Sequence, residues 1–124
     1  MTTANLRKLV VKCTAGVEAP ERCAQAFTVS ATALAAGAAV SLWLTGEASW
    51  LAVPGRAEAF DLPHSAPLAG LRDAVLAGGT LSVCTQCAAR RGIGQADLVA
   101  GAVIAGSASF VAEILAEGVQ ALVY

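Results

Sequence analysis

The stretch that decides the fold runs from residue 78 to residue 92 and reads Gly-Gly-Thr-Leu-Ser-Val-Cys-Thr-Gln-Cys-Ala-Ala-Arg-Arg-Gly. Residues 80–83 are mainly apolar or β-branched and follow a break at two glycines, which predicts a buried strand. The residues after it predict a short helix that stops at Gly92. Cys84 is therefore expected where a strand ends and a helix begins. Open parallel sheets place their ligand sites there, and the free N–H groups of a helix start favour a thiolate over a thiol.

On both sides of this stretch, strand-like and helix-like segments alternate along the chain. We expect strands at residues 9–13, 39–44, 80–83, 102–105 and 119–124, with helices between them. Short, continuous apolar strands separated by helices are typical of a parallel sheet that is covered on both faces. The predicted fold class is therefore α/β: a single domain over residues 1–124, built as a three-layer α/β/α sandwich around a five-stranded, mainly parallel sheet.

Residue types at the helix ends and along the helix faces give more detailed expectations. Pro20 and Glu21 suit the first turn of a helix, and Ser107 is expected to cap another. In the helix between the second and third strands, the leucines and valines predict an inner face. Arg72 and Asp73 are expected on its outer face.

The composition excludes several classes of protein. At 124 residues the chain suits one domain, and its formal net charge of −1, with Lys and Arg scattered along it, argues against nucleic-acid binding. The first eight residues contain no apolar segment of the kind found in a signal peptide. We therefore expect a cytoplasmic location, where cysteines stay reduced or take part in catalysis.

The longest uncharged stretch lies between Arg22 and Glu47, and its length alone would admit a membrane-spanning helix. The stretch is rich in Ala, Thr, Ser and Gly, and Gly37 divides it into a helix-like half and a β-rich half at residues 40–44. We therefore expect a buried helix followed by a buried strand, and no association with a membrane.

The Cys-x-x-Cys pair is compatible with several kinds of site. It could support thioredoxin-like redox chemistry, but it lies mid-chain without the aromatic and proline flank of such a motif, which argues against a dedicated disulfide reductase. Zinc would need two further ligands, and His64 with the other cysteines offers no second paired spacing. Cys84 and Arg90 have the spacing of a phosphatase loop, but the glycines that would wrap a phosphate are missing. No metal and no cofactor is predicted.

Cys84 is the expected nucleophile and Cys87 its partner, because cationic neighbours such as Arg90 and Arg91 lower the pKa of a thiol. Cys87 and Arg91 are four residues apart and share a helix face, so Arg91 could hold a thiolate or an anionic sulfur species. A solvated arginine is the alternative for Arg91. A buried thiol that acts as a small hydrophobic side chain is the alternative for Cys84.

The other two cysteines and the histidine are less informative. Cys13 ends a strand, and because parallel strands end along one edge, we expect it at the same crevice as Cys84, with core packing as the alternative. Cys23 lies on the predicted inner stripe of a helix and is expected to fill the core. His64 lies between prolines in a loop, where surface exposure is more common than a role as ligand or base.

The chain resembles the DsrE/DsrF-like family of sulfur-relay and related proteins. The resemblance rests on residues 81–84 leading into residues 88–93, on the first strand with its Gly16 turn, on residues 43–47 and on the closing residues 121–124. It implies that the cysteine at the end of this strand, here Cys84, accepts a persulfide, and that the protein forms trimers or hexamers. Sulfur carriers of the family typically have a small apolar residue where this chain has Cys87, although other branches show Cys-x-x-Cys here.

The resemblance, together with the position of Cys84, implies a sulfurtransferase-like carrier that accepts a persulfide on Cys84 and passes sulfur to a partner protein, with Cys87 as a redox gate. The alternatives are a non-catalytic oligomeric binding or scaffold domain and a thiol-disulfide redox protein that uses Cys84 and Cys87. A hydrophobic fraction of 56 % is more than one small core readily buries, which independently favours a homo-oligomer.

Overall fold

Five strands form the central sheet in the order β4-β3-β2-β1-β5, and every neighbouring pair is parallel. They are β1 (Lys8–Cys13), β2 (Ala39–Leu44), β3 (Thr80–Cys84), β4 (Val103–Ala105) and β5 (Val119–Val123). The computed structural model describes residues 7–124, so residues 1–6 of the expected domain lie outside the described part. The predicted α/β class is confirmed, and the sheet is parallel throughout.

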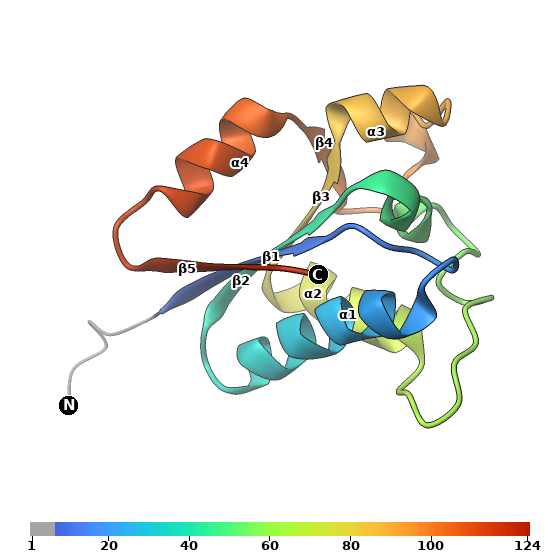
Figure 1. The fold of residues 1–124 in the computed structure, drawn as a ribbon, viewed down its shortest axis with the longest axis horizontal. Coiled ribbons are helices and arrows are strands. Elements are labelled where there is room, and N and C mark those ends of the chain that lie inside the picture. The colour runs from blue at the N-terminus through green and yellow to red at the C-terminus, as the bar shows by residue number, and fades with distance from the viewer. Residues whose placement is uncertain (1–6) are drawn as a thin grey trace.

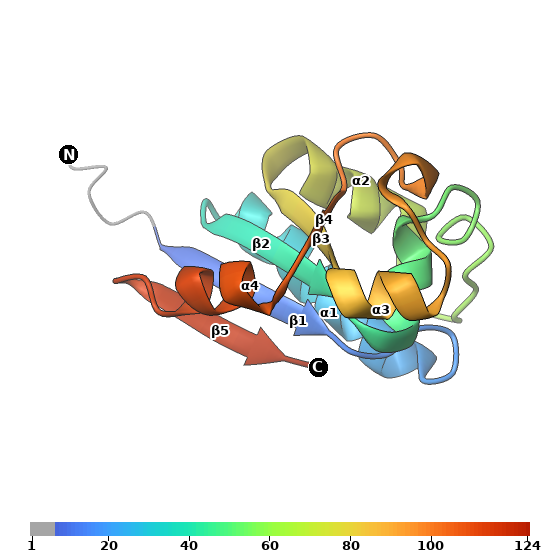
Figure 2. The ribbon, with the colours of Figure 1, turned by 90° about the horizontal axis from the view of Figure 1, so that it is seen from above.

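Helices cover both faces of the sheet (Figure 1). Helices α1 (Pro20–Ala35) and α2 (Leu68–Gly78) lie on one side, and α3 (Thr85–Arg90) and α4 (Ser107–Ile114) lie on the other (Figure 2). Two 3-10 helices, η1 (Gly46–Ala52) and η2 (Gln95–Asp97), lie in the connections after β2 and α3. The three-layer arrangement is the one expected from the alternation of strands and helices.

The main core lies between the sheet and the α1 and α2 layer. Side chains alternate between the two faces of a strand, and those that pack with Phe27 of α1 are fully buried. They are Val11 and Cys13 of β1, Leu42 and Leu44 of β2, and Leu81 and Val83 of β3. The intervening residues Lys12, Trp43 and Ser82 are register partners across three adjacent strands, and they face the α3 and α4 side.

The uncharged stretch folds as expected, as α1 followed by β2. Pro20 occupies the start of α1 and Glu21 its first turn, where a fixed φ and a negative charge both suit the helix. Across residues 7–124, no helix is both long and apolar enough to span a membrane.

The expectation that Ser107 caps α4 is wrong. Gly106 occupies the cap position with an extended backbone, and Ser107 is the first helical residue. No side chain makes a capping hydrogen bond at this end of α4. Because the backbone turns into the helix at Gly106, the helix begins one residue earlier than the serine suggested.

The expectation that Arg72 lies on the outer face of α2 is also wrong, since Arg72 is only 5 % exposed. Its Nη1 and Nη2 atoms donate to the two carboxylate oxygens of Glu58, at 3.0 and 2.7 Å, and its Nε donates to Asp73 at 3.0 Å. The hydrogen bonds from Arg72 lower the pKa of Glu58 to about 2. This bidentate ion pair links Glu58, in the long connection before α2, to the helix. Asp73 is exposed, as expected.

Candidate functional site

Cys84 lies where the sequence predicts it, at the carboxyl end of β3 and in the cap position of α3. It is half-buried, and it lines a cavity of about 40 Å³ on the α4 side of the sheet. The other residues that line this cavity are Lys12, Trp43, Thr45, Gly106, Ser107 and Phe110. The end of β3, residues at the ends of β2 and β1, and the start of α4 therefore border the space next to the cysteine.

The surroundings of Cys84 favour its thiolate. Burial raises the pKa of the Cys84 thiol, but hydrogen bonds and a charge more than offset this and leave the pKa below its ordinary value. The hydrogen bonds come from the backbone N–H of Cys87, the thiol of Cys87 and the backbone N–H of Gln86, and the charge is the ammonium of Lys12. A lower pKa increases the fraction of the nucleophilic thiolate near neutral pH.

Lys12, Trp43 and Phe110 build one wall of the cavity. The Phe110 ring meets the Trp43 ring edge to face, with centroids 5.3 Å apart, and Lys12 Nζ lies 5.2 Å from the Phe110 centroid. The sequence analysis missed all three as site residues. A signal existed for Lys12, because it interrupts the apolar run of β1 just before Cys13 and must face the opposite side of the sheet from Val11 and Cys13.

The two arginines are not placed at the Cys84 thiol. Arg91 donates from Nε to Glu47 at 2.8 Å and from Nη1 to the carbonyl oxygen of Cys87 at 3.0 Å. It shares a helix face with Cys87 as expected, but its guanidinium is occupied by the Glu47 carboxylate and a backbone carbonyl. Arg90 is exposed. The cation that acts on Cys84 is Lys12 instead.

Cys13 does not share a crevice with Cys84. Its strand end lies at the expected edge of the sheet, but its side chain faces α1, where Cys13 and Cys23 are both 0 % exposed. The Cys13 thiol donates to the carbonyl oxygen of Ala15 at 3.2 Å. A hydrogen bond to the Cys13 sulfur, together with burial, raises the pKa of Cys23. The core role expected for Cys23 is confirmed by its burial, and Cys13 is its partner there.

Two cysteines should therefore react in the folded protein and two should not. We expect iodoacetamide to label Cys84 and Cys87 in the native state, and to label Cys13 and Cys23 only after unfolding, because those two side chains are 0 % exposed. Since the pKa of Cys84 is lowered, its labelling rate should rise with pH and level off below the pH at which a free thiol does. Peptide mapping across a pH series checks this. Native labelling of Cys13 or Cys23 at the rate of Cys84 would contradict it.

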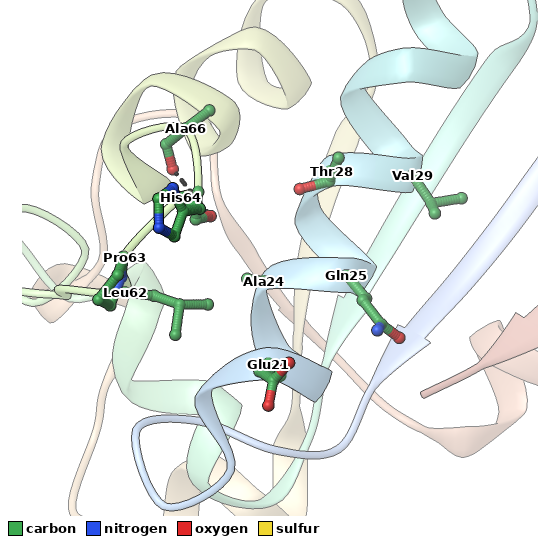
Figure 3. A pocket seen from close by; sticks show the side chains of 10 residues that line it. Glu21, Ala24, Gln25, Thr28, Val29, Leu62, Pro63, His64 and Ala66 are labelled. Atoms are coloured by element: carbon green, nitrogen blue, oxygen red, sulfur yellow. Dashed lines mark hydrogen bonds between the residues drawn. The ribbon is translucent and has the colours of Figure 1, made fainter.

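A larger cavity lies away from this chemistry. It measures about 470 Å³ and is formed between α1 and the loop of residues 62–66, with no cysteine among its lining residues. Figure 3 shows the loop side chains, including His64, opposite Gln25, Thr28 and Val29 of α1. His64 is exposed and has a left-handed backbone with φ of 61°. His64 does not line the Cys84 cavity.

A second cleft, of about 200 Å³, lies beside η1 and is lined by Glu47, Trp50 and Arg56 among others. The Arg56 guanidinium stacks on the Trp50 ring, 4.3 Å from its centroid. Within residues 7–124, no group of three or more His, Cys, Asp and Glu side chains is close enough to hold a metal ion.

The fold and the site define an α/β protein with a thiol of lowered pKa at the end of a parallel strand. The DsrE/DsrF-like family model matches residues 7–124, so the chain belongs to this family.

Two solved structures share the fold. The ychN protein from E. coli has a TM-score of 0.80 at 15 % identity, with 95 % of this chain and 99 % of that chain covered. MTH1491 from Methanobacterium thermoautotrophicum, a protein of unknown function, has a TM-score of 0.72 at 10 % identity with the same coverage. No curated protein sequence matches the chain.

Proposed function

We propose that the protein is a sulfur carrier that accepts a sulfane sulfur on Cys84 and passes it to a partner protein. The observation that carries the proposal is the half-buried Cys84 with a lowered pKa, which lines its own small cavity in a chain of the DsrE/DsrF-like family. The thiolate is the species that attacks sulfur, so this is the cysteine best prepared for the reaction.

The proposed transfer needs no oxidant. The Cys84 thiolate attacks the terminal sulfur of a donor persulfide, so that a sulfur–sulfur bond forms on Cys84 while the donor's sulfur–sulfur bond breaks. The donor leaves as a thiolate, and the proton of the terminal sulfur stays with the transferred atom until solvent takes it. A thiolate of the acceptor then attacks the outer sulfur and returns Cys84 as a thiolate.

Cys87 supports a second candidate function, thiol-disulfide chemistry. Its thiol and its backbone N–H both contribute to the lowered pKa of Cys84, which supports a disulfide between these two cysteines. A hydroperoxide could oxidise Cys84 to a sulfenic acid, itself being reduced to an alcohol, and Cys87 would then condense to a disulfide and release water. Such a disulfide would also gate the sulfur carrier, because it occupies the Cys84 sulfur.

Self-association and a reducing cytoplasmic location belong to the same proposal. Large apolar side chains remain exposed on β4, α4 and β5 and in the turn between the last two: Val103, Val111, Leu115, Leu122 and Val123. Their number in so small a domain favours self-association, and the family resemblance implies a trimer or hexamer. Light scattering should give three or six times the chain mass of 12.4 kDa, and a monomer mass at micromolar concentrations would contradict the assembly.

The direct test is incubation of the reduced protein with a low-molecular-weight hydropersulfide, followed by intact-mass measurement and peptide mapping. We expect a gain of one sulfur atom, located on Cys84. A protein that gains no sulfur would exclude the carrier, and it would leave the scaffold domain as the better hypothesis. A Cys84–Cys87 disulfide as the main product would favour the redox protein.

A further inference from the structure

A buried hydrogen-bond donor beside Cys84 has no acceptor. Trp43 is 3 % exposed, and its Nε1–H finds no hydrogen-bond partner among residues 7–124. Buried donors are nearly always paired, because an unpaired one loses its hydrogen bonds to water without replacement. Trp43 also lines the Cys84 cavity, so an acceptor placed in that cavity could satisfy it.

The cavity has a suitable size for one or two atoms. A volume of about 40 Å³ exceeds what one water needs, and the Phe110 ring, its Trp43 neighbour and the start of α4 border it. A sulfur attached to Cys84 Sγ would lie about 2.05 Å from it, the length of a sulfur–sulfur bond. The outer sulfur of a persulfide is therefore an occupant of suitable size within covalent reach.

The charge in the cavity suits an anion. Lys12 lines it, and no carboxylate forms an ion pair with Lys12 in the described part of the chain. A hydropersulfide loses its proton more readily than a thiol does, so its outer sulfur carries negative charge near neutral pH. An ammonium and an indole N–H would both stabilise that charge, and the cavity has no acidic side chain among its lining residues to oppose it.

We propose that this cavity is the binding site for the outer sulfur of a persulfide on Cys84, with the Trp43 indole N–H as hydrogen-bond donor and Lys12 as counter-charge. This inference rests on the proposed sulfur-carrier function and deepens it. The Trp43 donor is unused while Cys84 is a free thiol, and it gains its partner only when the outer sulfur is present. The site therefore favours the loaded state over the empty one, which is what a carrier requires.

The test compares two matched substitutions, Trp43→Phe and Trp50→Phe, which remove the only two indoles of the chain. Trp50 lines the separate cleft under Arg56, so its loss leaves the Cys84 cavity intact. Each variant is equilibrated with fixed ratios of glutathione hydropersulfide to glutathione, and the loaded fraction is read by intact mass. A hydrogen bond to a charged group predicts that Trp43→Phe lowers the loading equilibrium constant about tenfold. Trp50→Phe should leave it within about twofold, which is the range left by a substitution outside the site.

The outcomes separate this inference from the proposed function. Wild-type protein that does not load overturns both. Wild-type protein that loads, with Trp43→Phe loading equally well, overturns only the role of Trp43. If Trp43→Phe does not fold, the Trp50→Phe variant gives a second measurement, because Trp43 is then the sole fluorescent indole. Its emission should change on loading, and the change should disappear when Cys84→Ser is added. Unchanged emission on loading would overturn the inference.

Discussion

Replacing Cys84 by serine is expected to abolish the gain of one sulfur atom on incubation with a hydropersulfide, whereas Cys87→Ser should still load. Cys84 combines the strand end, hydrogen bonds from two backbone N–H groups and the charge of Lys12, which together lower its pKa. Cys87 lies in the first turn of α3 and does not line the cavity. Serine is nearly the size of cysteine, so the fold should survive both changes.

Cys87→Ser serves as the matched control because it removes the neighbouring thiol by the same substitution. The Cys87 thiol contributes to the lowered pKa of Cys84, so its loss should slow loading without preventing it. It should also prevent formation of the Cys84–Cys87 disulfide after treatment with peroxide. If Cys84→Ser gains the sulfur and Cys87→Ser does not, the second cysteine is the carrier and our assignment is wrong.

Gly79→Ala should destabilise the protein strongly, although Gly79 itself carries no reactive group. A Cβ at this position would lie 2.5 Å from the carbonyl oxygen of Val40 and 3.3 Å from that of Val75. Both contacts are backbone atoms, one of them in the central strand β2, so neither can move freely. Overpacking of this kind costs about 1–3 kcal/mol, and we expect the upper end of that range.

Gly70→Ala is the control for Gly79→Ala, since both change a glycine of the same region to alanine. Gly70 lies inside α2 and an added Cβ there meets no atom within 4 Å. Alanine is the better helix former, so Gly70→Ala should stabilise the protein by up to about 1 kcal/mol. Urea unfolding of both variants measures the difference. Equal stability of the two would show that the Gly79 turn can relax around a side chain.

Local sequence signals were enough to predict the strands and the position of Cys84. Residues 80–84 carry a short apolar strand after two glycines, and the strand folds there as β3. The fold class follows because five such runs alternate with helices. The order of the strands did not follow, since the sequence does not say which strands pair. That order decides that β2 lies next to β3 and β1 lies next to β2, and so places Trp43 and Lys12 at the cavity that Cys84 lines.

The errors arose where tertiary partners decide what a side chain does. Arg91 was expected either to hold a sulfur anion or to be solvated, but its guanidinium donates to Glu47 of η1 instead. Arg72 was expected at the surface, but its side chain is buried and its guanidinium donates two hydrogen bonds to the Glu58 carboxylate. Cys13 was expected beside Cys84 because both end parallel strands. Cys13 does end its strand at that edge of the sheet, but its side chain points to the opposite face from the Cys84 cavity. The alternation of side chains along β1 indicates this, because Lys12 and Cys13 must face opposite sides.

The alternation along β1 makes the reactivity of Cys84 depend on correct strand pairing. Lys12 and Cys13 are neighbours in the chain, yet the Lys12 side chain lines the cavity and the Cys13 side chain packs in the core. A slip of β1 by one residue against β2 would exchange them, burying an ammonium and leaving the cavity with a thiol in place of its cation. The hydrogen bonds within α3 can act on Cys84 by local folding, but the cationic charge of Lys12 reaches the cavity only through the pairing of the strands. A copy in which the N-terminal strand has not docked in register therefore lacks one of the causes that lower the pKa of Cys84.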